Sequence, residues 1–316
     1  MITSQDLRGV MAMMPAFTTP DGGDYRSTNT VNVDELSRAV DQAVKDGINV
    51  LSTTGSFGEC HTLLPDEFEA LTRATIETVN KRIPVFIGCT SLHTREVMRK
   101  MEVARDAGAD GVLIGVPFYF PGTVDNAVRF YHDCAEAFPT LGIMIYHNPT
   151  FHNITLPVAA FNRITQSPQV VAMKDSHRNP LEFMRLNEVV KGKMTVFVNQ
   201  LQYYPYHEMG ADGFWSFDLW MGPWPILRLR DAMDSGDIDL AKQIIFDIAA
   251  GGSGPQDLHW RENTAKLATA SAGYCDPGPL RPPFVEIPDA IIAQAKKRAE
   301  EWKALSARYA PAGARA

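Results

Sequence analysis

The chain has 316 residues, of which 45% are hydrophobic and 21% are charged, and its formal net charge at pH 7 is -7. This is the composition of an ordinary globular enzyme, and without a basic stripe it argues against nucleic acid as a partner. The longest apolar runs are strand-sized and far below the roughly 20 residues of a membrane helix, so we expect no membrane partner.

Short β-rich runs alternate with longer helical patterns along most of the chain. Most of these runs are continuously apolar, as expected for parallel strands that are covered on both faces. The strands expected in chain order are Val10–Thr18, Val50–Thr54, Val85–Cys89, Gly111–Gly115, Gly142–Tyr146, Val170–Lys174, Thr195–Asn199 and Gly213–Ser216.

Segments with helical spacing separate these strands. Gly47, Gly108 and Gly210 follow three of the segments, where a left-handed C-cap is expected, and Pro65 and Pro180 suit first-turn positions. The helices expected are Val33–Asp46, Pro65–Asn80, Thr94–Ala107, Val124–Ala137, Leu156–Ile164, Pro180–Val190, Tyr203–Met209 and Gly222–Ser235.

Eight strand–helix units in this length favour a closed barrel over a doubly wound sheet. The rest of the chain lacks strand signals and predicts helices at Ile238–Ala250, Gln256–Ala272 and Pro288–Tyr309. The expected fold class is therefore α/β, with a (β/α)8 TIM barrel at residues 1–236. Residues 237–316 are expected to form a C-terminal helical extension that packs on the barrel.

Lys174 is the sharpest chemical feature, because it closes an apolar strand and chemistry in a barrel sits at the carboxyl ends of strands. Burial of a lysine amine favours its neutral form, which is a nucleophile for carbonyl groups. The resulting imine would serve as an electron sink. The alternative is a lysine that simply pairs with an acid at a strand end.

Two other strand ends carry groups that fit such a reaction. Tyr146 ends the preceding strand, and its phenol could move protons, although a lone tyrosine is more often a half-buried aromatic with a solvated hydroxyl. The turn Gly55–Glu59 offers a hydroxyl and closely spaced N–H groups for a carboxylate. A Gly-x-x-Gly turn alone is weak evidence for a binding site. The stronger evidence is that the turn, Tyr146 and Lys174 all lie at strand ends.

In the order and spacing of these three motifs, the chain resembles the dihydrodipicolinate synthase / N-acetylneuraminate lyase family of class I aldolases. The resemblance implies that Lys174 forms the imine, that Tyr146 is the proton shuttle and that Ser56 relays protons to it. Ser56 and the N–H groups around Phe57 would hold the carboxylate. Tyr119 matches the family's relay tyrosine that reaches a neighbouring subunit, and the family's usual assembly implies a homotetramer.

Departures from the family pattern indicate the substrate. Phe57 replaces a hydroxyl residue of the turn, and residues 148–152 lack the arginine with which dihydrodipicolinate synthases bind a second carboxylate. Phe57, Phe118 and Trp215 instead predict an aromatic mouth that suits a flat hydrophobic substrate.

A closer resemblance is to the hydratase-aldolases of polycyclic aromatic degradation, which cleave benzylidenepyruvates to an aromatic aldehyde and pyruvate. It extends from about Arg26 to Tyr309 and rests on five segments: RSTNTV at 26–31, GSFGECHT at 55–62, TREV at 94–97, FWS at 214–216 and RPP at 281–283. It implies a Schiff-base-forming hydratase-aldolase, a lyase acting on an aryl-substituted unsaturated pyruvate.

The roles of several residues near these motifs stay open. Asn148 could position the attacking water or the new hydroxyl, or could be the turn residue before Pro149. Trp260 and Arg261 could read the aryl end of the substrate, or could be a helix-face tryptophan beside a solvated arginine.

Asp175 and His177 could orient Lys174 or form a loop network, His147 is expected to be a packed neighbour, and Glu59 is expected to tie its turn by backbone hydrogen bonds. The eight histidines show no metal-ligand spacing. An imine through Lys174 needs no metal or other cofactor, so none is expected.

The compartment follows from the N-terminus and the cysteines. Residues 1–9 lack the basic-then-apolar pattern of a signal peptide. Cys60, Cys89, Cys134 and Cys275 are widely spaced and are typical of reduced thiols. We therefore expect a cytoplasmic protein.

Two other functions remain to be separated from this one. The first is another pyruvate-dependent aldolase of the same family that acts on a sugar-derived or aliphatic 2-keto acid. The second is a non-catalytic barrel that binds a keto acid or serves as a structural protein. In the enzymatic cases the partner is a small 2-keto acid.

Overall fold

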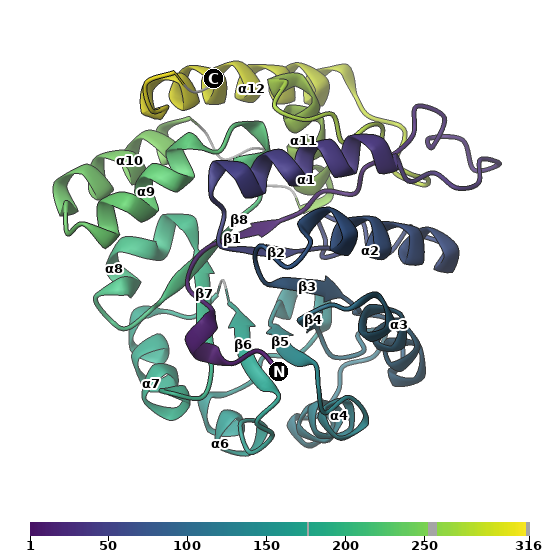
Figure 1. Ribbon diagram of the computed structural model, residues 1–316, viewed down its shortest axis with the longest axis vertical. Helices are drawn as coiled ribbons and strands as arrows, with labels where there is room; N and C mark the ends of the chain where they lie inside the picture. The colour runs from purple at the N-terminus through teal and green to yellow at the C-terminus, as the bar shows by residue number, and fades with distance from the viewer. Residues whose placement is uncertain (176, 252–257, 314–316) are drawn as a thin grey trace. The chain divides into compact units, whose positions relative to one another are not determined.

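The computed structural model describes residues 1–175, 177–251 and 258–313, without the side chains of residues 258–263. The chain, coloured along its length in Figure 1, forms two compact units. Unit 1 comprises Met1–Met11, Asn49–Gly55 and Lys81–Trp215, and unit 2 comprises Ala12–Ile48, Ser56–Asn80 and Ser216–Ala316. The division into a barrel at 1–236 and an extension at 237–316 stays a prediction.

Eight strands form a closed barrel in the order of the sequence, which confirms the predicted (β/α)8 fold. Each pair from β2–β3 to β7–β8 is parallel, as expected when a helical connection returns the chain between neighbouring strands. The strands are β1 (Gly9–Met13), β2 (Val50–Ser52), β3 (Val85–Gly88), β4 (Gly111–Ile114), β5 (Gly142–Tyr146), β6 (Val170–Lys174), β7 (Thr195–Asn199) and β8 (Gly213–Ser216).

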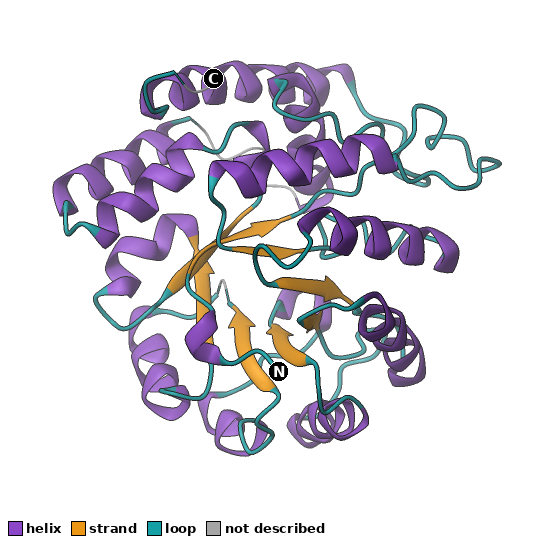
Figure 2. Ribbon diagram, in the orientation of Figure 1, coloured by secondary structure: helices purple, strands orange, loops and turns teal. Residues whose placement is uncertain are grey.

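The strands of unit 1 are buried on both faces, which explains their continuously apolar sequences. Every residue of β3, β4, β5 and β6 is buried, and Figure 2 shows helices on the outer side of these strands. The strand predicted at Val10–Thr18 is shorter than expected, because β1 ends at Met13. Pro15 follows closely and has no N–H to give to a ladder.

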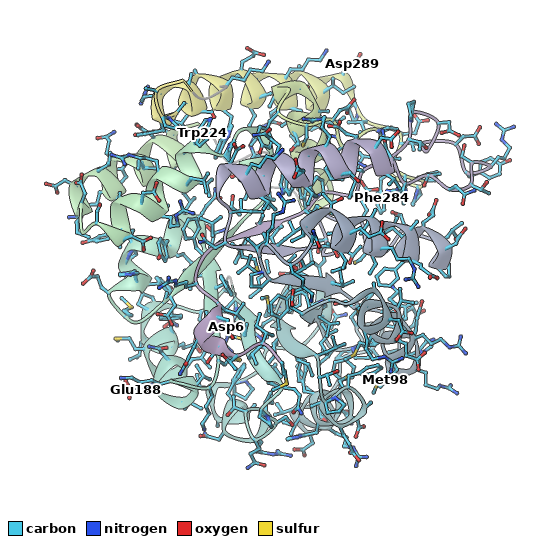
Figure 3. All side chains as sticks on the ribbon, in the orientation of Figure 1. Asp6, Met98, Glu188, Trp224, Phe284 and Asp289 are labelled. Atoms are coloured by element: carbon cyan, nitrogen blue, oxygen red, sulfur yellow. The ribbon has the colours of Figure 1, made fainter. Side chains whose placement is uncertain are left out.

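Capping residues set the ends of several helices in unit 1. Thr123 and Asn179 accept hydrogen bonds from backbone N–H groups of the first turn, and Gly108 ends its helix in the left-handed conformation. Exposed side chains such as Glu188 point away from the strands (Figure 3). The helices are α3 (Thr94–Ala107), α4 (Val124–Ala137), α5 (Pro149–His152), α6 (Phe161–Ile164), α7 (Pro180–Val190) and α8 (Tyr203–His207), with 3-10 turns at Ser4–Asp6, Val158–Ala160 and Gln200–Gln202.

Two details of this unit differ from the prediction. The helix expected at Leu156–Ile164 is a 3-10 turn followed by α6, and Pro157 at the N-cap accounts for the late start. The four-residue helix α5 was not predicted, because a single turn carries no periodic pattern.

Unit 2 contains the remaining helices. In Figure 1, α12 lies beside α11, and α9 lies beside α10. The Trp302 indole donates to the carbonyl of Gly222 at 2.9 Å, and the Trp220 indole donates to the carbonyl of Met13 at 2.8 Å. The helices are α1 (Val33–Asp46), α2 (Pro65–Val79), α9 (Trp224–Asp234), α10 (Ile238–Ala250), α11 (Leu258–Ala272) and α12 (Asp289–Tyr309), with a 3-10 turn at Asp218–Met221.

Among the described residues, no helix combines the length and the apolar character needed to cross a membrane. Cys60, Cys89, Cys134 and Cys275 form no disulfide, as the sequence predicts; three of them are buried, and Cys60 is half-buried.

Gly88 lies in β3, where this strand packs closely against the residues that follow β2. A Cβ atom at Gly88 would lie within 3.0 Å of the backbone oxygens of Thr53 and Thr54. Gly88→Ala should therefore lower the free energy of unfolding by about 1–3 kcal/mol, because backbone atoms must move. Urea unfolding measures the change. Gly122→Ala is the control, because its methyl group meets nothing closer than 3.8 Å; equal losses for the two variants would contradict the prediction.

Candidate active site

Lys174 is buried in unit 1 between two aromatic rings. The residue is 5% exposed, and its Nζ lies 3.7 Å from the centre of the Trp215 ring and 4.9 Å from the centre of the Tyr146 ring. The β5–β6 register places Tyr146 directly beside Lys174 on the neighbouring strand. The amine is therefore buried, with aromatic surface on two sides.

Trp215 is held in place by the residue that follows the lysine. Its indole N–H donates to the backbone carbonyl of Asp175 at 3.0 Å. The N–H of Asp175 in turn donates to the carbonyl of Phe197 in β7 at 3.0 Å. The end of β6 thus determines both where the amine lies and how the indole ring is oriented against it.

The Asp175 side chain is the centre of a separate polar cluster. Neighbouring residues of a strand point to opposite faces, and Asp175 follows Lys174 directly. Its Oδ1 accepts hydrogen bonds from Arg178 Nη1 at 2.9 Å, and it lies 3.1 Å from His147 Nδ1 and 3.0 Å from His177 Nδ1. Of the two interpretations left open by the sequence, the contacts of Asp175 and His177 fit the loop network.

Arg178 connects this cluster to the loops around it. Its Nη2 donates to the carbonyl of Leu156 at 2.5 Å, and its own carbonyl accepts from the hydroxyl of Tyr206 at 2.6 Å. Its guanidinium also lies 5.2 Å from the centre of the Phe161 ring. Arg178 is not identifiable from the sequence, because a loop arginine carries no local signal of burial.

The protonation states within the cluster follow from its hydrogen bonds. The N–H of Leu156 donates to His147 Nε2 at 3.0 Å, so Nε2 is an acceptor and Nδ1 carries the proton that faces Asp175. Burial lowers the pKa of His147 to about 4, although the hydrogen bond to Asp175 opposes the shift. Burial would raise the pKa of Asp175, but hydrogen bonds from the histidines and the charge of Arg178 hold it well below its ordinary value.

His147, Asp175 and His177 bring possible metal ligands together, with ligand atoms within 4.8 Å of one another. The spacing of these residues along the sequence did not suggest such a group. Two features fit a hydrogen-bonded cluster better than a metal site. His147 Nδ1 carries a proton where a metal needs a lone pair, and the Arg178 guanidinium binds the carboxylate oxygen that a metal would need.

The loop after β5 turns directly into α5. Asn148 is the half-buried N-cap of this helix, and its carbonyl accepts from the N–H groups of Phe151 at 3.1 Å and His152 at 2.8 Å. The Asn148 side chain makes no capping bond, so its backbone forms the turn. His152, which the sequence analysis did not single out, is 4% exposed and lies edge-to-face with Tyr146 at a centre-to-centre distance of 4.9 Å.

Ser56 and Phe57 belong to unit 2, in the turn that follows β2 along the chain. Ser56 is half-buried, and its carbonyl accepts from the N–H of Glu59 at 3.0 Å. Phe57 is 5% exposed, and its ring centre lies 5.1 Å from that of Phe217.

The carboxylate of Glu59 forms ion pairs, whereas the sequence predicts only backbone hydrogen bonds within its turn. It pairs with the Lys266 amine, and one of its oxygens lies 3.3 Å from Arg281 Nη1. The same amine donates to Thr18 Oγ1 at 2.8 Å and to the Pro279 carbonyl at 2.7 Å. Burial lowers the pKa of Lys266 to about 8 against the influence of Glu59. Glu59 thus anchors its turn to α11.

The structure brings Lys174, Tyr146 and Trp215 together in unit 1. Tyr119 lies in the loop after β4 and is 74% exposed, with its ring 5.0 Å from that of the 76% exposed Phe120. The side chains of Trp260 and Arg261 lie outside the described part of the chain.

Comparisons with known proteins agree in one family. A model described as the dihydrodipicolinate synthetase family matches residues 10–250. The chain is 33% identical to the trans-O-hydroxybenzylidenepyruvate hydratase-aldolase of Pseudomonas putida, across 98% of this chain and 96% of that protein. It is 28% identical to the trans-2'-carboxybenzalpyruvate hydratase-aldolase of a Nocardioides strain, across the same shares. A solved structure described as PhdJ bound to a substrate intermediate has a TM-score of 0.92 and 30% identity, with 98% of this chain and 99% of that chain covered.

The buried neutral state of His147 predicts a pH dependence of stability. Its pKa is about 4 in the folded chain, below the ordinary 6.5, so the unfolded chain binds more protons between these values. The free energy of unfolding should fall as the pH drops from 6.5 to 4, with His147 contributing on the order of 2–3 kcal/mol.

His147→Asn should remove this part of the loss, as measured by urea unfolding at pH 7 and pH 4.5. His93→Asn is the matched control, because His93 is an exposed N-cap residue whose capping bond an asparagine can make. An unchanged pH dependence in His147→Asn would show that this histidine is not buried in its neutral form.

Proposed function

The chain belongs to the dihydrodipicolinate synthetase family, and we propose that it is a hydratase-aldolase that forms a Schiff base through Lys174. The substrate class is an aryl-substituted unsaturated pyruvate of the benzylidenepyruvate type, and the products are an aromatic aldehyde and pyruvate. The observation that carries the proposal is the buried Lys174 amine between the rings of Tyr146 and Trp215. Relatives named for this reaction match nearly the whole chain.

The first step is the condensation of the Lys174 amine with the ketone of the substrate. A carbon–nitrogen bond forms, one water molecule leaves, and the product is a cationic imine conjugated with the carbon–carbon double bond. The imine withdraws electrons through this double bond, so a second water molecule adds at the benzylic carbon and a proton is taken up at the adjacent carbon. The face of the Trp215 ring stabilises the positive charge on the nitrogen.

Cleavage of the carbon–carbon bond uses the same electron sink. Tyr146 accepts the proton of the new hydroxyl as its own phenol proton passes on along the proton relay, the bond between the benzylic carbon and its neighbour breaks, and the electron pair moves into the imine to form an enamine. The aromatic aldehyde leaves. The enamine then regains a proton at carbon, and water hydrolyses the resulting imine to release pyruvate and the free Lys174 amine. The reaction requires no metal and no organic cofactor.

The other residues are assigned roles that stay predictions. We assign Ser56 to proton relay with Tyr146 and to binding the substrate carboxylate, on the strength of the family motif. Asn148 is assigned to the attacking water or the hydroxyl, and its lack of a capping bond supports this assignment. Phe57 and Trp215 are assigned to the aromatic part of the substrate, since both present large buried rings.

Two assignments rest on weaker support. A homotetramer is proposed from the family pattern, and Tyr119, exposed beside Phe120, is assigned to an interface between copies of the chain. A cytoplasmic location is proposed from the cysteines, which form no disulfide.

Imine formation can be tested directly with pyruvate and borohydride. Reduction should add a pyruvate-derived mass increment to the peptide that contains Lys174, and Lys174→Ala should lose both the increment and all measurable turnover. Lys191→Ala is the matched control, because Lys191 is an exposed lysine of the same unit, and it should keep both. An increment that persists in Lys174→Ala, detected by peptide mass spectrometry, would move the imine to another residue.

The substrate class can be tested with hydroxy-, carboxy- and unsubstituted benzylidenepyruvates. These compounds absorb strongly in the ultraviolet, so cleavage should appear as a falling absorbance together with aldehyde and pyruvate production. We expect turnover of at least one of them and a kcat/KM for sugar-derived keto acids lower by at least about 100-fold, because an apolar mouth leaves sugar hydroxyls unpaired. Turnover of the sugar-derived acids alone would support the other pyruvate aldolase.

A further inference from the structure

His152 is a buried, titratable side chain for which the proposed mechanism has no role. It ends α5, the short helix absent from the sequence prediction, and it is 4% exposed. Its ring lies perpendicular to the Tyr146 ring, at an interplanar angle of 87° and a centre-to-centre distance of 4.9 Å. This is the edge-to-face arrangement in which the positive edge of one ring meets the negative face of the other.

The His152 ring also lies close to Gly115. A Cβ atom at Gly115 would lie within 3.0 Å of three atoms of the imidazole. Phe118, three residues further along the same loop, has its ring centre 6.1 Å from that of His152. The imidazole therefore packs against the loop after β4 as well as against Tyr146, and glycine at position 115 leaves the space that the ring occupies.

The His152 ring is neutral in this position. Burial is the main cause that lowers the pKa of His152 to about 4; repulsion from the protonated forms of His147 and Lys174 acts in the same direction, and a hydrogen bond at the Tyr146 backbone opposes the shift. At neutral pH the ring thus contributes packing surface and no positive charge. A second cation so near Lys174 would disfavour the cationic imine.

We propose that His152 is a positioning residue that fixes the plane of the Tyr146 ring and hence the direction of its hydroxyl. This inference rests on the proposed role of Tyr146 as the group that takes the hydroxyl proton. Proton transfer requires the phenol oxygen within hydrogen-bond reach of the substrate hydroxyl. A displacement of about 1 Å can cost about 100-fold in rate. Imine formation by Lys174 does not need the His152 contact and should survive its loss.

The test separates the two steps. His152→Ala should lower the rate constant for cleavage in single turnover by about 10- to 100-fold, while the KM and the borohydride trapping of pyruvate on Lys174 stay within about threefold of the wild type. His207→Ala is the control, because His207 is a half-buried histidine of the same unit whose ring contacts Tyr203 and not Tyr146, and it should leave both measurements unchanged. Unaltered cleavage in His152→Ala would overturn the proposal.

Gly115→Ala disturbs the same contact, because its methyl group must displace the imidazole. Cleavage should slow in this variant also. In the His152→Ala background the ring is gone, so adding Gly115→Ala should produce no further loss. Effects that multiply in the double variant would show that the two residues act independently and would overturn the proposal.

A general disturbance of the site is distinguished by the trapping measurement. If His152→Ala loses trapping and cleavage together, Gly115→Ala decides, since it adds a single methyl group. Retained trapping with slowed cleavage in Gly115→Ala supports the positioning role, and an equal loss of both overturns it. Failure of the proposed function would appear elsewhere, as an absence of pyruvate trapping on Lys174 in the wild-type protein.

Discussion

The feature on which the candidate site in unit 1 depends is the burial of the Lys174 amine at the end of β6. Lys174 is covered by protein, so its ammonium form loses the hydration that it has in water. The faces of the Trp215 and Tyr146 rings offset part of that loss, because aromatic faces attract a cation. A lysine that attacks a ketone must be neutral at that step and then carries the positive charge of an imine, which the two ring faces would stabilise.

Because neighbouring side chains of a strand point to opposite faces, Lys174 and Asp175 have different surroundings. Lys174 faces the aromatic rings, whereas the Asp175 carboxylate meets a guanidinium and two imidazoles. The Asp175 carbonyl holds the Trp215 indole that lies over the amine. One short stretch of backbone therefore joins the aromatic surroundings of Lys174 to a polar cluster, and its carbonyl holds the Trp215 indole in place. Such preorganisation lowers the cost of orienting groups during the reaction.

Unit 2 shows why a lowered lysine pKa does not by itself identify a nucleophile. Burial lowers the pKa of Lys266 to about 8, yet its amine donates to a carboxylate, a hydroxyl and a carbonyl. An ammonium group has three hydrogens to donate, and these three acceptors match them. The geometry indicates a structural role for Lys266, as the anchor of the turn at Glu59. Lys174 differs in having aromatic rings as its neighbours.

The sequence by itself determined the barrel and the place of the key lysine. Apolar runs of strand length reproduce the bounds of β5 to β8, and the rule that chemistry lies at strand ends selects Lys174 and Tyr146 without knowledge of any contact. The roles of Ser56, Phe57, Asn148, Trp215 and Tyr119 remain predictions from motifs.

Only the tertiary structure decided the positions of His152 and Arg178, the Asp175 cluster and the pairing of Glu59 with Lys266. His147 and Asp175 are 28 positions apart, and Glu59 and Lys266 are 207 apart. Local patterns record propensity and periodicity, whereas these contacts depend on which distant segments fold against each other, and no local pattern encodes that.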